Sequence, residues 1–171
     1  MDDPMDDPLT NVVFRPSRSD DQAPMEAVRK VAFAPVFASF RSILGDSIYE
    51  RAQAPDDEAQ RALLTSLVQP DSGWDVYVAE MAGTIVGFVA IQMNRERQVG
   101  EIGLNAVHPD HAGRGIGTAM YEFALASMKE EGMRVATVAT GGDPSHTPAR
   151  RAYKKAGFAL EIPSVWLCRE L

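Results

Sequence analysis

The sequence predicts a mixed α/β fold of the α+β class, with a central, mostly antiparallel sheet of six to seven strands. Two β-rich runs joined by a glycine turn, "WDVYVAEMAGTIVGFVAIQM", form the clearest hairpin in the chain. Strand-like and helix-like segments alternate after it, so two strands joined by a crossover helix should lie parallel. A last apolar run, "FALEIPSVWLCREL", predicts one or two closing strands.

The N-terminal part is predicted to hold a tail, a strand and helices. Residues 1–10, "MDDPMDDPLT", are too acidic and proline-broken to pack, so we expect a disordered tail followed by a single domain over 11–171. "NVVFRP" is typical of a short strand. From 19 to 67, apolar residues recur at helical intervals, with interruptions at Pro35 and near "QAPDDE", which predicts two or three short helices.

Glycine and proline mark the later elements. Ala82-Gly83 separates the hairpin strands, because glycine adopts the positive φ that tight turns require. "GEIGLNAV" predicts a strand, 115–131 predicts an amphipathic helix, and "RVATVAT" predicts the next strand. Pro148 suits the first turn of the last helix, and Gly157 ends that helix.

Composition narrows the classes of function. The formal charge is −7, of which four negative charges lie in the tail, leaving −3 for the rest. A mildly acidic body argues against binding to nucleic acid and tolerates a cationic partner such as an amine. Cys168 is the only cysteine, so we expect no intramolecular disulfide, no structural zinc and a buried thiol in the last strand. With no signal-like start and no long apolar run, a cytoplasmic protein that does not enter a membrane is expected.

The stretch "VHPDHAGRGIGTAM" places three glycines directly before a predicted helix. The N–H groups at a helix N-terminus and the helix dipole favour an anion, and glycines allow a phosphate close to the main chain. A dinucleotide fingerprint would need glycine where Thr118 stands, and a P-loop would need Gly-Lys-Ser/Thr. Both motifs fail, so the loop alone leaves two readings open: a phosphate cradle, or a turn that only starts a helix.

"IGLNAVHPDHAGRGIGTAM", followed about thirty residues later by "PARRAYKKAGF", resembles the GNAT superfamily of N-acetyltransferases. The resemblance covers the chain from about Phe14 to the C-terminus. It implies one parallel, splayed strand pair, about four flanking helices, and acetyl-CoA as cosubstrate without a metal. The family loop reads Gln/Arg-x-x-Gly-x-Gly/Ala, and this chain departs from it with Ala112 at the first position.

The resemblance also implies which residues contact acetyl-CoA. Val107 would lie beside the pantetheine arm at the end of a strand. The loop would surround the pyrophosphate through Ala112, Gly113, Arg114, Gly115, Ile116, Gly117 and Thr118. His146 stands where many members have an asparagine that contacts CoA. It could bind the pantetheine or the acceptor, with helix capping or solvent exposure as the plainer reading.

Two residues are candidates for the chemistry. An amine nucleophile must lose a proton, and Glu101, at the start of a strand where several GNAT enzymes use a glutamate, is a candidate base. Strand alternation would put Glu101, Gly103 and Asn105 on one face unless a bulge intervenes, and Asn105 could orient water. Tyr153 matches the family tyrosine that gives a proton to the leaving thiolate. A solvated carboxylate and a core aromatic remain the respective alternatives.

These observations predict an acetyl-CoA-dependent N-acetyltransferase that moves acetyl to a primary amine of a small molecule or peptide by direct transfer in a ternary complex. A backbone N–H near Val107 or His108 would polarise the thioester carbonyl. The alternative is a non-catalytic acyl-CoA-binding or regulatory module. The acceptor amine cannot be read from the sequence, and neither can the oligomeric state, for which a homodimer stays open.

Overall fold

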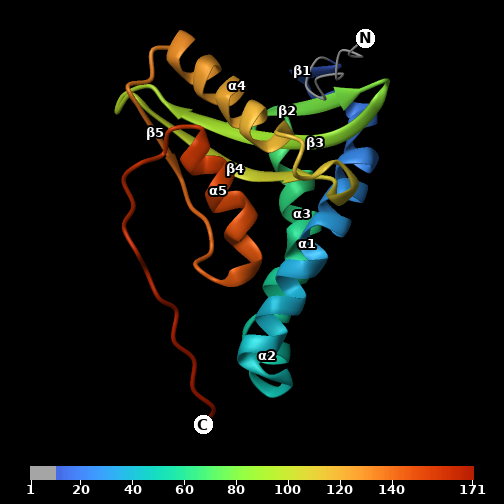
Figure 1. Cartoon of the computed structure of the whole chain (residues 1–171), viewed down its shortest axis with the longest axis vertical. Helices are drawn as coiled ribbons and strands as arrows, with labels where there is room; N and C mark the ends of the chain where they lie inside the picture. The colour runs from blue at the N-terminus through green and yellow to red at the C-terminus, as the bar shows by residue number, and fades with distance from the viewer. Residues whose placement is uncertain (1–10) are drawn as a thin grey trace, which may run out of the picture.

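The computed structural model describes residues 11–171, so the predicted disordered tail at 1–10 lies outside the described residues. Five strands form one sheet in the order β1-β2-β3-β4-β5 (Figure 1). Neighbouring strands are antiparallel except β4 and β5, which are parallel. The strands are β1 (Val12–Pro16), β2 (Trp74–Met81), β3 (Thr84–Asn94), β4 (Val99–Val107) and β5 (Val135–Val138).

The predicted hairpin between β2 and β3 is confirmed. Its two turn residues, Ala82 and Gly83, have φ values of 49° and 77°. Positive φ at both central residues is the signature of a type I′ turn, whose twist matches that of the paired strands. The two turn residues therefore specify locally the register in which β2 and β3 pair next to the turn.

Helices cover both faces of the sheet. On one face lie α1 (Gln22–Leu44) and α3 (Ala54–Leu67), and the short turn η1 (Ser19–Asp21) precedes them. The short helix α2 (Asp46–Ala52) links α1 to α3 at their ends far from the sheet (Figure 1). The predicted break near "QAPDDE" is confirmed at Gln53, between α2 and α3. The predicted break at Pro35 is wrong, because Pro35 lies inside α1. Its ring sits on the exposed side of the helix, so the lost hydrogen bond does not interrupt the face that packs on the sheet.

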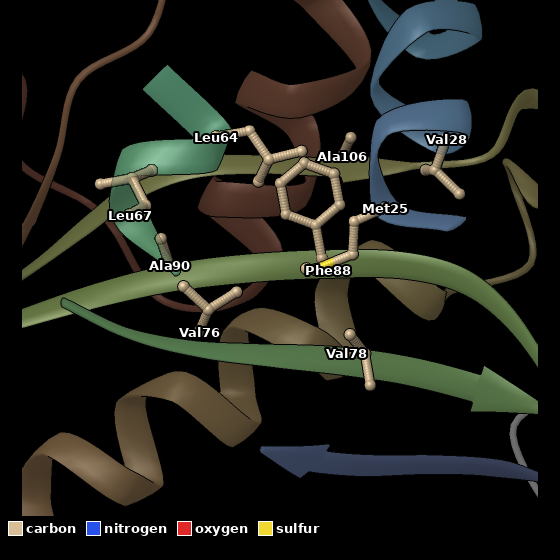
Figure 2. Packing of buried hydrophobic residues seen from close by; sticks show 9 residues of the cluster. All are labelled: Met25, Val28, Leu64, Leu67, Val76, Val78, Phe88, Ala90 and Ala106. Atoms are coloured by element: carbon tan, nitrogen blue, oxygen red, sulfur yellow. The ribbon is translucent and has the colours of Figure 1, made fainter. Parts of the chain in front are cut away.

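Two apolar layers hold the helices to the sheet. Figure 2 shows the first, between the sheet and α1 and α3, where Phe88 is fully buried against Met25 and Leu64. The second lies under α4 (Ile116–Glu130) and α5 (Thr147–Lys155) and includes Met120 and Met128. Burial of apolar surface on both sides makes the central strands almost wholly apolar.

The parallel strand pair is splayed, as the resemblance implied. β4 pairs with β5 only from Val99 to Ile102, so the second half of β4 has no partner on that side among residues 11–171. In the same region β4 carries an extra residue, because Val89 and Ile91 of β3 pair with Asn105 and Ile102. This bulge reverses the side on which the following residues point.

The bulge corrects one expectation. A Cβ added to Gly103 would meet Trp74 on the α1 side of the sheet, whereas Asn105 bonds to Tyr153 on the α5 side. Glu101 pairs with Gln92, which in turn pairs with Trp74, so Glu101 also faces the α1 side. The prediction that Glu101, Gly103 and Asn105 share a face is therefore wrong for Asn105.

The predicted closing strands are absent, and the described sheet has five strands where six to seven were expected. Residues 159–171 are extended and exposed, with no ladder to β5. Pro163-Ser164 is the only turn signal in this segment, and proline cannot adopt the positive φ that a two-residue hairpin needs at its first position. Cys168, expected to be buried in the last strand, is consequently exposed.

Candidate active site

The loop between β4 and α4 forms a row of free N–H groups. It passes through the short turn η2 (Pro109–His111), and then Gly113 and Gly115 adopt φ values of 76° and 84°. Within residues 11–171, the N–H groups from Gly113 to Thr118 donate to no other protein group, and the first helical bond runs from Ala119 to Gly115. Six consecutive donors at a helix N-terminus make a site for an anion.

The loop is exposed and is held in place by one buried side chain. Ile116 packs with Ala79 and Val86, which fixes the first turn of α4 against the sheet. Arg114 and Ala112 are exposed, and Ala112 brings no polar side chain to the loop. Gly117 is not required sterically, since an added Cβ would stand 3.9 Å from its nearest neighbours. The backbone, rather than the side chains, makes this site.

Asn105 connects two tyrosines beside the splayed half of β4. Its Nδ2 donates to the hydroxyl of Tyr153 on α5 at 3.0 Å, and the hydroxyl of Tyr121 on α4 donates to its Oδ1 at 2.8 Å. The two tyrosine rings stack with their centroids 4.4 Å apart. Burial, followed by the neighbouring Tyr153, raises the pKa of Tyr121, so that hydroxyl stays protonated. A hydroxyl can accept one hydrogen bond and donate another. The Tyr153 hydroxyl accepts from the Asn105 side chain and therefore still has its own proton to donate.

Glu101 lies on the other side of β4 from this cluster. Its carboxylate is exposed and makes no hydrogen bond or ion pair within the described part of the chain. Glu101 pairs with Thr137 of β5. The next pair, Ile102 with Val138, is the last one before the two strands diverge. The structure therefore does not bring Glu101 and Tyr153 onto one face. It places them on opposite faces of the sheet, on either side of the opening between β4 and β5.

The loop between β5 and α5 holds His146 in a polar cluster. The Nδ1 of His146 lies 2.5 Å from a carboxylate oxygen of Asp143, and its ring stacks on Phe40 of α1 at 5.9 Å. Ser39 of α1 donates to the same carboxylate at 2.9 Å, and Ser145 also donates to it. A Cβ on Gly141 would come within 2.5 Å of the imidazole, so glycine is needed for this packing.

Asp143 is ionised in this setting. Burial raises the pKa of the carboxyl, but hydrogen bonds from Ser145, Ser39 and His146 outweigh burial and lower the pKa to about 2. Arg150 of α5 adds order by donating to the carbonyl oxygens of Gly141 and Asp143. A carboxylate fixed in this way holds the His146 ring in one orientation.

The structure combines the splayed parallel strands β4 and β5, the glycine loop before α4 and Tyr153 on α5. A match to a model of a protein family agrees with this combination. The model of the Acetyltransferase (GNAT) family matches residues 37–158, which is more than half of the chain. The chain belongs to the GNAT family. The predicted family membership is thereby confirmed, and the matched range includes Glu101, the cradle, His146 and Tyr153.

Curated relatives of this GNAT chain are longer proteins. An uncharacterised N-acetyltransferase of Methanocaldococcus jannaschii is 37% identical over 97 residues, covering 53% of this chain and 42% of that protein. A mycothiol acetyltransferase of Cellulomonas flavigena is 39% identical over 62 residues, covering 36% of this chain and 17% of that protein. The aligned part of this chain thus spans less than half the length of either relative.

Solved structures share the fold of this GNAT chain. An N-acetyltransferase from Thermoplasma acidophilum, solved in complex with coenzyme A, superposes with a TM-score of 0.69 at 17% identity, covering 90% of this chain and 92% of that chain. At this identity the likeness shows the fold alone. It agrees with the mixed sheet and the helices on both faces described above.

Other expectations for this GNAT chain concern metal and membrane. Across residues 11–171, no three His, Cys, Asp or Glu side chains converge to hold a metal ion, and His108 and His111 contact each other edge to face. In the same residues, no helix combines the length and the apolar character that crossing a membrane requires. A cytoplasmic location and the absence of nucleic-acid binding stay predictions.

Two residues that contact the candidate site residues were not predicted from the sequence: Tyr121, which stacks on Tyr153, and Asp143, which lies next to His146. Tyr121 reads as part of an amphipathic helix, and no local signal links it to Asn105 sixteen residues earlier. Asp143 could have been found, because "DPSH" is typical of an Asp that caps a turn, and the side chain of Asp143 does accept from the N–H of Ser145. Its second role, orienting His146, depends on α1 and could not be read locally.

Proposed function

We propose that this chain is an acetyl-CoA-dependent N-acetyltransferase that transfers acetyl directly to a primary amine of a small molecule or peptide. The observation that carries the proposal is the row of six free N–H groups from Gly113 to Thr118, next to the splayed half of β4. GNAT membership and the coenzyme A held by the Thermoplasma acidophilum protein support it. We further propose that 11–171 acts as one domain.

In this proposal the cradle binds the pyrophosphate of CoA. Each N–H bond to a charged phosphate oxygen contributes about 1.5 to 3 kcal/mol, so several of them anchor the cosubstrate without a dedicated lysine. The pantetheine arm would follow the opening between β4 and β5, where Val107 lies. The adjacent Arg114 would add charge at the rim of the cradle.

Main-chain geometry supports Val107, rather than His108, as the group that polarises the thioester carbonyl. The N–H of His108 already donates to the carbonyl oxygen of Val86 on β3 at 2.8 Å. Because successive residues of a strand point their N–H groups to opposite edges, the N–H of Val107 points toward the open side of β4. A donor fixed at that edge would stabilise the negative charge that develops on the oxygen.

The two proton-transfer roles fit the two faces of β4. Glu101, exposed on the α1 side, would accept the proton of the attacking amine directly or through water. Tyr153, oriented by Asn105 on the α5 side, would give a proton to the sulfur as the C–S bond breaks. Placing acid and base on opposite sides suits direct transfer, in which the amine arrives as the thiolate leaves. Direct transfer forms no covalent acetyl-enzyme and therefore needs no activated nucleophile on the protein.

We propose that His146 lines the binding site at the base of α5. Asp143 fixes the imidazole, and Phe40 brings α1 next to it. The turn η3 (Pro144–His146), which carries His146, follows β5 and packs between α1 and the start of α5. His146 would therefore contact the pantetheine arm or the acceptor, depending on how far the amine reaches.

The test is release of free thiol from acetyl-CoA in the presence of a panel of amines: amino acids, polyamines, aminoglycosides, peptides and the amine precursor of mycothiol. We expect amine-dependent thiol release with at least one class, and mass spectrometry should find a product heavier by one acetyl group. Thermal shift supplies the binding control. CoA at about 100 times its Kd should stabilise the fold by about 2.7 kcal/mol, and NAD should have no effect.

The alternative function, a non-catalytic acyl-CoA-binding module, predicts a different pair of results. It gives full stabilisation by CoA and no thiol release with any amine. Lack of stabilisation by CoA would contradict both functions, because each of them needs the cradle.

A further inference from the structure

Gly103 of β4 lies under an aromatic ring that reaches across the sheet. A Cβ added to Gly103 would stand 2.6 Å from the Cη2 atom of Trp74, so a larger residue would displace the indole ring. Glycine inside a strand often marks a close approach of this kind. Trp74 is the first residue of β2, and β3 lies between β2 and β4. The ring therefore spans β3 and rests on the backbone of β4.

The start of β2 holds Trp74 in this position. The N–H of Trp74 donates to the hydroxyl of Ser72 at 3.1 Å, and that hydroxyl donates to the carbonyl oxygen of Leu67 in α3 at 2.8 Å. Gly73 has a φ of 75°, which turns the chain between these two residues. The apolar cluster under α1 and α3 packs against part of the ring, and Trp74 stays half-buried. The indole is thus a fixed wall with an accessible part.

This wall lies beside the candidate base. Trp74 pairs with Gln92 of β3, and Gln92 pairs with Glu101 of β4, so the three side chains form a row on the α1 side. Thr137 of β5 extends the row by pairing with Glu101. Trp74 and Gln92 are half-buried, whereas Glu101 and Thr137 are exposed. The row therefore leads from the covered part of the sheet to a part that is open to a ligand.

The row combines one carboxylate with one aromatic ring. Gly103, which the ring covers, is two residues from Glu101, a separation of about 6 to 7 Å along the strand. An amine at Glu101 would therefore place a group two or three bonds from its nitrogen against the indole. Gln92 and Thr137 supply hydrogen-bonding groups without charge. A polyamine or an aminoglycoside would leave all but one of its ammonium groups without a carboxylate in this row.

We propose that Trp74 determines which amine this chain accepts, by binding an apolar group of the acceptor while the amine lies at Glu101. The acceptor is then a small primary monoamine with an aromatic or branched aliphatic group close to the nitrogen. Burial of that group against the indole, and stacking where the group is aromatic, supplies the selectivity. This inference rests on the proposed acetyl transfer, because it names the acceptor class for that reaction.

The fluorescence of Trp74 tests binding without turnover. The chain has two tryptophans, so Trp166→Phe leaves Trp74 as the only indole. In this variant with saturating CoA, titration with phenethylamine or isoamylamine should change the fluorescence to a plateau. Putrescine should need at least about 10-fold higher concentration for the same change. No saturable response to phenethylamine, or an equal response to putrescine, would overturn the proposal.

The thiol-release assay tests selectivity. In the wild type, kcat/KM should be at least about 10-fold higher for phenethylamine than for ethylamine, which lacks only the ring. Trp74→Leu should lose this preference through a higher KM for phenethylamine, and Trp74→Phe, which keeps an aromatic ring, should retain most of it. The matched control is Trp166→Leu, at a tryptophan that is 61% exposed, and it should keep the preference. An unchanged preference in Trp74→Leu would contradict the proposal.

Stabilisation by CoA separates loss of the acceptor contact from loss of folding. It should be the same in the wild type and in all three variants, because none of the changes touches the cradle. If Trp74→Leu does not fold, Trp74→Phe and the fluorescence titration decide the question.

The acceptor proposal and the acetyl-transfer proposal fail in different ways. A saturable response of Trp74 to phenethylamine without thiol release would contradict acetyl transfer and support the amine site. Thiol release with amines that leave Trp74 fluorescence unchanged would contradict the amine site and support acetyl transfer. Absence of both signals would contradict both proposals.

Discussion

Replacing Tyr153 with phenylalanine separates the catalytic reading of this residue from the structural one. The change removes one hydroxyl and keeps the ring that stacks on Tyr121 at 4.4 Å. The lost bond is the one from Asn105 at 3.0 Å, and the same Nδ2 still donates to the carbonyl oxygen of Gly103 at 2.8 Å. The protein should therefore stay folded.

The two expected effects differ in size. Loss of one hydrogen bond whose donor keeps another partner costs about 0.5 to 1.5 kcal/mol. In a protein of this length, about 1 kcal/mol lowers Tm by roughly 2 to 4 °C. Loss of a general acid lowers kcat by about 10²- to 10⁴-fold, which corresponds to about 2.7 to 5.4 kcal/mol in the activation barrier.

Tyr121→Phe is the matched control. It removes the hydroxyl that bonds to the other end of the same amide at 2.8 Å, in the same ring stack. Both variants should lose a few degrees in Tm by calorimetry, and both should bind CoA. Only Tyr153→Phe should lose turnover in the thiol-release assay. Unchanged kcat in Tyr153→Phe, or an equal loss in both variants, would refute a role for Tyr153 as proton donor.

Three further outcomes are expected. Glu101→Gln should lower kcat by about 10²- to 10⁴-fold, with part of the loss relieved at high pH as the amine deprotonates in solution; an unchanged pH profile of kcat/KM would exclude it as the base. The lowered pKa of Asp143 stabilises the fold above the ordinary pKa of 3.8, and this contribution should be lost as pH falls from about 4 to about 2. Asp143→Asn should remove about 1 to 3 kcal/mol of stability at neutral pH and flatten that acid dependence in denaturant titrations, whereas an unaltered acid limb would contradict the assignment. Gly115→Ala should cost about 1 to 2 kcal/mol because φ is 84°, and should weaken CoA binding by calorimetry. Gly142→Ala, where φ is not positive and nothing lies within 4 Å, should change neither quantity.

Elements marked by local signals could be predicted from the sequence. Ala82-Gly83 and Gly157 act through their own backbone conformation, so their effect is independent of the rest of the chain. The alternation of strands and helices around the glycine loop likewise fixed the parallel pairing of β4 and β5 through the handedness of crossover connections.

Features that depend on distant partners could not be predicted in this way. The bulge before Asn105 cannot be recognised from the alternation of polar and apolar residues, and it decides on which face of the sheet the Asn105 side chain lies. Pro35 looked like a helix break, although α1 continues through it to Leu44 with the proline on the exposed side of the helix. The closing strands were expected from their alternating pattern, but that pattern states only that the segment favours pairing, not which edge it finds.

The residues of the candidate site also divide into those that local sequence could predict and those that depend on distant partners. The cradle from Gly113 to Thr118 is a continuous stretch of chain and could be located from its glycines. The cluster around His146 joins a loop to Ser39, 104 residues away from Asp143, so neither its geometry nor its charge could be seen in the sequence. Tyr153 could be aligned with a family motif, whereas its partner Tyr121 could not.

Hydrogen exchange with and without CoA tests the central claim most directly. The amides from Gly113 to Thr118 donate to no group within residues 11–171, so they should exchange fast in the free protein. With saturating CoA, peptides covering this loop should become strongly protected, and with NAD they should not. Protection by CoA elsewhere with no change in this loop would contradict the account, because the cradle would then not be where the cosubstrate binds.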